Sequence, residues 1–175
     1  MKSEQVMILG VGNILFSDEG FGIKIIEELE EKYEFPENVS LVDGGVLGVL
    51  LMGIMSAADQ LIVVDVIRNK GVPGDLYRLE GESVPERIRA KNSLHQIDFL
   101  EALTLCQALD KVPETVIVGV EPEDIKTLST KLTATIRNRK SDVIRMVLNE
   151  LDRLNITYKE KGTIDNVPCD SIKNN

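Results

Sequence analysis

The stretch VMILGV at residues 6–11, followed by GNILFSD at residues 12–18, decides the fold class. The first part is a short apolar run rich in branched side chains, which is typical of a strand buried on both faces. The second part is a loop that begins with glycine. After it, apolar residues recur at helical spacing between charged ones, at Ile23, Ile26, Leu29 and Tyr33. A buried strand that leads through a loop into an amphipathic helix predicts the first half of a βαβ unit.

The same alternation continues along the chain. Apolar runs predict further strands at 39–42, 61–64 and 115–120, helices at 46–57, 97–109 and 143–154, and a half-exposed edge strand at 75–79. Strands that alternate with helices form right-handed crossovers. We therefore expect an α/β fold with three layers: a mostly parallel twisted sheet, helices on both faces and one antiparallel edge strand.

Length and composition predict one domain. The chain has 175 residues, of which 43% are hydrophobic, which suits a single domain with a real core. We place this domain at residues 1–155. From Asn155 onward the sequence is polar and has no periodicity, so residues 156–175 are predicted to form a mobile tail.

Charge and hydropathy narrow the classes of partner. The 20 basic and 29 acidic residues give a net charge of −9, which would repel a phosphate backbone and argues against nucleic acid. The longest apolar stretch, residues 46–55, is about half the ~20 residues of a membrane-spanning helix. The first residues do not resemble a signal peptide. We expect a cytoplasmic protein without membrane contact, and the sequence specifies no oligomeric state.

Acidic residues follow the strands at the edge where α/β folds gather their sites. Glu19 lies in the loop after the first strand, and Asp43 directly follows the second. Helix capping is the alternative for the acidic segment Ser17–Glu19, because serine and acids stabilise helix N-termini. A simple turn is the alternative for Asp43, which precedes two glycines.

Asp65 and His95 complete the candidate set. Asp65 follows four apolar residues, so its carboxylate is expected to be partly buried and to need a metal ion, N–H donors or a cation. Arg68 is the nearest candidate cation. His95 is the only histidine in the chain, so any imidazole ligand must be this residue. The alternative interpretation of His95 is an ordinary polar residue on the surface.

Together, Glu19, Asp65 and His95 form a donor set that suits Zn, Ni, Mn, Fe or Co and leaves coordination positions open. The sequence has no H-E-x-x-H or G-x-S-x-G motif, and Cys106 and Cys169 lie in poor contexts for nucleophiles. A nucleotide-dependent oxidoreductase is a further alternative. Position 15 is leucine where the G-x-G-x-x-G motif needs its third glycine, so no nucleotide site is expected.

Several segments, in order and spacing, resemble those of the hydrogenase maturation proteases. They are MILGVGNIL at 7–15, SDEGFG at 17–22, LVDGG at 41–45, LIVVDV at 61–66, SLHQ at 93–96 and VGVEP at 118–122. The resemblance extends from about residue 6 to about residue 155 and does not include the tail.

The resemblance implies an endopeptidase that removes the C-terminal extension of a nickel–iron hydrogenase large-subunit precursor after nickel insertion. By this resemblance Glu19, Asp65 and His95 match the metal ligands, and Asp43 matches an acid that helps to recognise or cleave the substrate. The nickel would arrive with the precursor, and other divalent ions would substitute in vitro. The peptidase would be of aspartic or metallo type, with water activation by the metal or by Asp43 left open. The alternative is a non-catalytic maturation chaperone that binds the same precursor.

Overall fold

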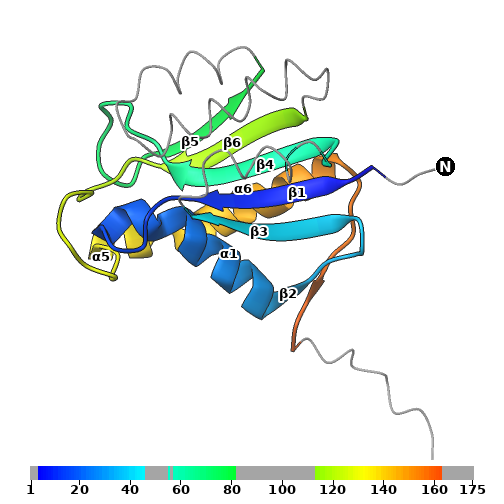
Figure 1. Cartoon of the computed structure of the whole chain (residues 1–175), viewed down its shortest axis with the longest axis horizontal. Helices are drawn as coiled ribbons and strands as arrows, with labels where there is room; N and C mark the ends of the chain where they lie inside the picture. Colours follow the sequence, from blue (N-terminus) through cyan, green and yellow to red (C-terminus); the bar gives the residue numbers. More distant parts are fainter. Residues whose placement is uncertain (1–3, 46–54, 56, 82–112, 163–175) are drawn as a thin grey trace, which may run out of the picture.

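The computed structural model describes residues 4–45, 55, 57–81 and 113–162. Its centre is a five-stranded sheet in the order β3-β1-β4-β6-β5 (Figure 1). The strands are β1 (Val6–Val11), β3 (Val39–Gly45), β4 (Gln60–Val66), β5 (Leu76–Glu80) and β6 (Glu114–Val120). The pairings of β1 with β3, β1 with β4 and β4 with β6 are parallel, whereas β5 pairs antiparallel with β6. The predicted α/β fold, with a mostly parallel sheet and one antiparallel edge strand, is confirmed.

Two long helices, α1 (Phe21–Lys32) and α6 (Lys140–Arg153), cover one face of the sheet (Figure 1). Their apolar sides pack on alternate residues of the strands, and the cluster includes Ile8, Val64, Phe21 and Val147, all fully buried. The shorter elements η1 (Ser17–Gly20) and α5 (Ala134–Arg137) lie in the loops that follow β1 and β6. None of the described helices is long and apolar enough to cross a membrane.

A second apolar cluster lies on the opposite face of the sheet. It contains the other set of alternate strand residues, among them Leu9 and Val63, together with the helical residue Met55. All six residues of β1 are buried, as expected for a strand covered on both faces. The remainder of the predicted helix at 46–57 lies outside the described residues, except for Ala57 in a turn, and the predicted helix at 97–109 lies wholly outside them.

Two glycines bring the start of α1 close to the carboxyl end of the sheet. A Cβ atom on Gly22 would lie 2.3 Å from the carbonyl oxygen of Val64 and 2.4 Å from that of Val11. A Cβ on Gly10 would lie 2.5 Å from the carbonyl oxygen of Gly22. Any larger residue would push the helix away from β1 and β4. These glycines therefore set where the loop between β1 and α1 lies relative to the end of β4.

The strand order creates a topological switch point between β1 and β4. From β1 the chain crosses to β3 on one side, whereas from β4 it continues to β5 and β6 on the other side. The loops after β1 and β4 therefore diverge, and in open α/β sheets ligands bind at such a switch point. Gly10 pairs with Asp43 on β3 and with Val64 on β4, so these residues lie at one level across three adjacent strands.

An ion pair fixes the edge strand β5 to helix α6. Arg78 donates from Nε to Glu150 Oε1 at 2.7 Å and from Nη2 to Oε2 at 2.9 Å, and Arg153 also donates to Oε1, at 2.6 Å. Burial by itself raises the pKa of Glu150, but the hydrogen bonds from Arg78 and Arg153 outweigh it and lower this pKa below its ordinary value. The carboxylate thus stays charged although its side chain is only 7% exposed.

The chain after α6 returns to the amino end of the sheet. Strand β7 (Lys159–Glu160) pairs antiparallel with β2 (Tyr33–Glu34). Tyr158 packs against Tyr33 and Phe35 with ring centroids 6.0 and 6.2 Å apart. The sequence places residues 156–162 in a mobile tail, but these contacts hold them against the domain. Residues 163–175 lie outside the described residues. The sequence did not predict the packing of residues 156–162, because two apolar side chains, Ile156 and Tyr158, are too few to form a sequence period.

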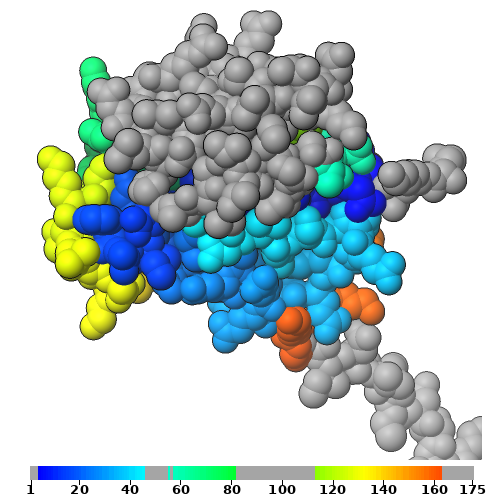
Figure 2. Space-filling view, in the orientation of Figure 1, coloured from blue at the N-terminus to red at the C-terminus, as the bar shows by residue number. Residues whose placement is uncertain are grey.

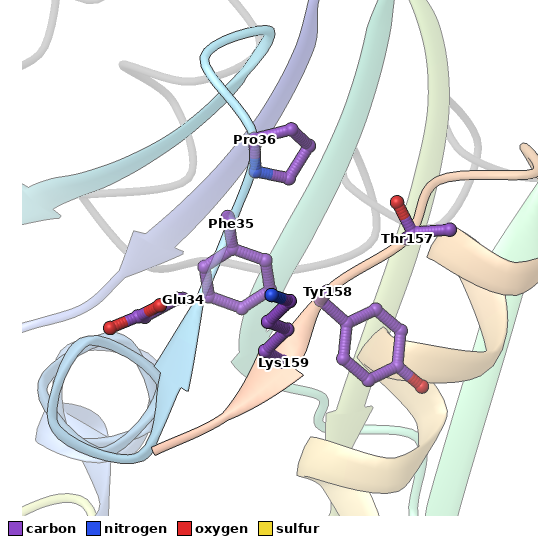
Figure 3. A pocket seen from close by; sticks show the side chains of 6 residues that line it. All are labelled: Glu34, Phe35, Pro36, Thr157, Tyr158 and Lys159. Carbon is purple, nitrogen blue, oxygen red and sulfur yellow. The ribbon is translucent and has the colours of Figure 1, made fainter. Parts of the chain in front are cut away.

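A hollow of about 330 Å³ lies at this amino end of the sheet. Figure 3 shows its lining, to which Phe35 and Pro36 contribute before β3 and Tyr158 contributes beside β7. The loops at the carboxyl ends of the parallel strands lie at the opposite edge. This hollow is therefore separate from the predicted site.

Candidate functional site at the carboxyl edge of the sheet

Glu19 lies in η1, and the loop around it fixes its backbone on both sides. Its N–H donates to the carbonyl oxygen of Phe16 at 3.0 Å, and its own carbonyl oxygen accepts from the N–H of Asn13 at 3.0 Å. Gly12 adopts φ +139°, and a Cβ there would lie 1.9 Å from the Glu19 carbonyl oxygen. The turn around Glu19 therefore requires glycine at position 12. The Glu19 side chain is half-buried and takes part in an interaction.

Asp18, its neighbour, is fully buried and joins two loops that are distant in sequence. Its Oδ2 accepts from the N–H groups of Glu123 and Asp124 at 3.0 and 2.9 Å. Thr133 donates its N–H to Oδ1 at 2.8 Å and its hydroxyl to Oδ2 at 3.1 Å. Helix α1 has no side-chain cap, and Gly20 is its N-cap residue. The helix-cap interpretation is therefore wrong for Asp18, which instead holds the loop after β6 against the loop after β1.

Asp65 is the sixth residue of β4 and pairs with Gly119 on β6. A Cβ at position 119 would lie 2.1 Å from the carbonyl oxygen of Asp65, so glycine allows this close approach. The carboxylate is half-buried as predicted, accepts from the N–H of Val66 at 2.7 Å and has a further interaction. Arg68, the alternative cation for this carboxylate, is exposed.

Asp43 lies two strands away from Asp65 and faces the other side of the sheet. Its neighbour Val42 packs in the cluster opposite α1, so by strand alternation Asp43 points toward the α1 side. It is exposed and lines a hollow of about 160 Å³ that Gly12, Asn13, Ile14, Ile23 and Gly45 complete. Asp65, between Val64 and Val66 of the α1 cluster, points to the opposite side. Asp43 therefore does not belong to the same cluster as Asp65.

The predicted metal site is described only in part. Glu19 and Asp65 lie on the two segments that flank the switch point, and η1 lies against β4. His95 lies outside the described residues. Within the described part of the chain, no three His, Cys, Asp or Glu side chains gather to hold a metal ion. The ligand set Glu19, Asp65 and His95 therefore stays a prediction.

A second buried acid, Glu121, lies at this edge of the sheet, and it is not among the candidate residues that the sequence indicates. Glu121 follows β6 directly and is 7% exposed. Its Oε2 accepts from the N–H of Asn69 at 2.8 Å and from the Tyr77 hydroxyl at 2.9 Å. Burial, together with this hydrogen bond to Glu121, raises the pKa of Tyr77. The contact ties the loop after β4 to the end of β6. Its only sequence indication is an acid placed directly after a buried strand.

Comparison with known proteins agrees on one family. A family model described as hydrogenase maturation protease matches residues 23–150. The chain is 35% identical over 170 residues to the hydrogenase 2 maturation protease of Escherichia coli, a match that covers 96% of this chain and 98% of that protein. It is 33% identical over 163 residues to the hydrogenase expression/formation protein HupD of Bradyrhizobium diazoefficiens, covering 92% of this chain and 85% of HupD.

The fold agrees with the same family. The structure is similar to that of the hydrogenase maturating endopeptidase HybD from E. coli, with a TM-score of 0.86 at 33% identity. The match covers 90% of this chain and 98% of that one. The chain therefore belongs to the hydrogenase maturation protease family.

Proposed function

We propose that this chain is the endopeptidase that removes the C-terminal extension of a nickel–iron hydrogenase large-subunit precursor once nickel has been inserted. The family and the relatives named as maturation proteases support the endopeptidase role. The observation that carries the finer proposal is that Glu19 and Asp65 flank the switch point between β1 and β4. We propose that the protein works in the cytoplasm.

Nickel, in this proposal, arrives as part of the substrate. We propose that Glu19, Asp65 and His95 supply ligands to the open positions of nickel held by the precursor, so that only loaded precursor is bound productively. Carboxylate and imidazole donors suit nickel and related divalent ions, which is why other ions are expected to substitute in vitro. A half-buried Asp65 that follows four buried apolar residues provides a partly dehydrated carboxylate for this purpose.

Cleavage adds water to the scissile carbonyl and breaks the amide bond. The proposal gives Asp43 a role distinct from metal binding, and its support is that Asp43 is exposed and lines a hollow on the α1 side of the sheet. In one route Asp43 would accept a proton from the attacking water and pass it to the leaving amine. In the other route the nickel held by the precursor would activate the water while Asp43 positions the peptide. The two routes differ in whether Asp43→Asn lowers mainly kcat or mainly raises KM.

The test compares nickel-loaded and nickel-free precursor, each incubated with the wild-type protein, His95→Ala, Glu19→Gln and Glu37→Gln. Glu37 is an exposed acid beside the amino end of β3 and serves as the matched control. We expect mass spectrometry to show shortening of loaded precursor only. Loss of more than about a hundredfold in rate is expected for His95→Ala and Glu19→Gln, and no loss for Glu37→Gln.

Three results would contradict parts of this proposal. Equal processing of both precursors would rule out nickel sensing. Full activity of His95→Ala would remove that residue from the site. Binding of loaded precursor without any mass change, in the wild type, would favour the alternative of a non-catalytic maturation chaperone.

A further inference from the structure

Four large apolar side chains are exposed on two loops at the carboxyl edge of the sheet. Ile14, Leu15 and Phe16, after β1, are 44%, 52% and 37% exposed, and Leu128, after β6, is 75% exposed. We call these four residues the apolar rim. Single exposed apolar residues are common on protein surfaces, whereas several on adjoining loops indicate a contact surface.

Hydrogen bonds place the two loops side by side. The N–H of Ser129 donates to the carbonyl oxygen of Leu15 at 2.9 Å. The N–H of Ser17 donates to the carbonyl oxygen of Ser129 at 2.7 Å. Phe16 and Ser129 form a parallel bridge. Leu128 therefore lies next to the segment of Leu15 and Phe16. Figure 2 shows the two segments, blue and yellow, adjoining at one end of the molecule.

The apolar rim is held in place by buried groups below it. The Asp18 carboxylate accepts hydrogen bonds from Glu123, Asp124 and Thr133, and the Ser17 hydroxyl donates to the carbonyl oxygen of Lys131 at 3.1 Å. Both Ser17 and Asp18 are buried. A surface ordered in this way loses little conformational entropy when a partner binds, so its apolar area contributes more of its free energy to binding.

The apolar rim is continuous with the proposed reaction site. Ile14 belongs to the rim and also lines the hollow that contains Asp43. A chain whose scissile bond lies beside Asp43 would therefore extend over Ile14 toward Leu15, Phe16 and Leu128.

We propose that the apolar rim is the docking surface for an apolar segment of the hydrogenase large-subunit precursor, adjacent to the bond that is cleaved. This inference rests on the proposed function and adds the surface that selects the substrate. The charged residues within three positions of Leu128 are Lys126 and Lys131, both exposed, whereas the acids Glu123 and Asp124 lie farther back in the same loop. Acidic residues of the precursor next to Leu128 would therefore strengthen docking. A second copy of this chain fits less well, because each copy carries a net charge of −9.

The test uses the double variant Leu15→Ser/Leu128→Ser and the control Val72→Ser. Val72 is 69% exposed, comparable to the two rim residues, and lies in the separate loop between β4 and β5. Calorimetry gives the Kd for purified nickel-loaded precursor, mass spectrometry gives KM and kcat, and sedimentation gives the oligomeric state. We expect the double variant to raise Kd and KM about tenfold or more with kcat nearly unchanged, and the control to behave like wild type.

Each other outcome has a definite meaning. Unchanged Kd and KM in the folded double variant would overturn the inference, as would an equal loss in Val72→Ser. A wild-type dimer that the double variant dissociates without any change in Kd would assign the rim to self-association and would also overturn it. If wild type binds precursor without shortening it, the endopeptidase proposal fails while the Kd comparison still decides the docking surface.

Discussion

Asp18 accepts a hydrogen bond from the backbone N–H of Thr133 at 2.8 Å, although the two residues are 115 positions apart in the chain. The contact joins the loop that carries Glu19 to the loop that carries Leu128. The same carboxylate also accepts from two further backbone N–H groups, those of Glu123 and Asp124. One buried side chain thus connects the proposed metal site, the proposed docking surface and the start of α5.

The first prediction concerns the stability that this carboxylate provides. Asp18→Ala removes a fully buried carboxylate that accepts hydrogen bonds from three backbone N–H groups. We expect the free energy of unfolding in urea to fall by about 3 kcal/mol, since buried donors left without partners are costly. Glu37→Ala, which removes an exposed acid, should change it by less than about 0.5 kcal/mol. A loss below about 1 kcal/mol in Asp18→Ala would show that water replaces the carboxylate.

The second prediction concerns Glu150 and pH. Its pKa is lowered in the folded protein because the hydrogen bonds from Arg78 and Arg153 outweigh the effect of burial. A lowered folded-state pKa means that the stabilisation is fully present above the unfolded value of about 4.3 and is lost as pH falls through the folded value. We therefore expect Glu150→Gln to lose about 3 kcal/mol at pH 7, with the difference from wild type shrinking at acidic pH.

Urea unfolding of both proteins at a series of pH values measures this difference. Glu27→Gln is the control, because Glu27 forms an ion pair with Lys24 but its side chain is 55% exposed. The exposed pair should contribute less than about 1 kcal/mol at any pH. If the free energies of unfolding of wild type and Glu150→Gln differ by the same amount at every pH, the charge on Glu150 is not the source of the stabilisation.

The third prediction separates the two acids of the candidate site. Asp43 and Asp65 lie two strands apart and point to opposite faces of the sheet. We expect Asp65→Asn to weaken nickel binding by about tenfold or more in calorimetry, and Asp43→Asn to leave it nearly unchanged. Both variants should process loaded precursor far more slowly than wild type. Loss of nickel binding in Asp43→Asn would place that residue among the ligands and contradict the separate role proposed for it.

The fourth prediction concerns the end of the domain. Ile156 and Tyr158 pack against the core, and β7 pairs with β2, so residues 156–162 should stabilise the protein. A chain that ends at Gly162 should be more stable than one that ends at Asn155 by about 2 kcal/mol or more, the contribution of one or two buried apolar side chains. Thermal and urea unfolding of the two chains measure the difference. Equal stabilities of the two chains would instead place the end of the stable domain at Asn155.

The strands were predictable because their burial leaves a continuous apolar run in the sequence. The run at residues 61–64 lies inside β4, and alternation at 75–79 identified the antiparallel edge strand β5 within one residue. The interaction of Tyr158 with Tyr33 was not predictable. It joins residues that are far apart in the chain, and the segment around Tyr158 shows no period of its own.

The sequence predicts which acids are candidates for the site, but it does not predict the role of each. Placement after a strand identified Glu19, Asp43 and Asp65, because parallel strands end at one edge of the sheet. Which face each side chain occupies depends on register, and a shift of one residue would exchange the faces. In the sequence Asp18 resembles a helix cap. The four hydrogen bonds that its carboxylate accepts come from Glu123, Asp124 and Thr133, which are more than a hundred positions away and leave no local pattern.

The sequence by itself determined the α/β alternation, the buried strands and the acids that follow them, because local periodicity and composition record burial directly. Only the tertiary structure decided that Asp18 joins two loops, that Asp43 and Asp65 face opposite sides, and that Leu128 lies beside Leu15 and Phe16. These relationships depend on strand order and on close approaches at Gly12 and Gly22, where a backbone atom occupies the space that a Cβ would fill. Such contacts join distant segments, and no local pattern of residues records them.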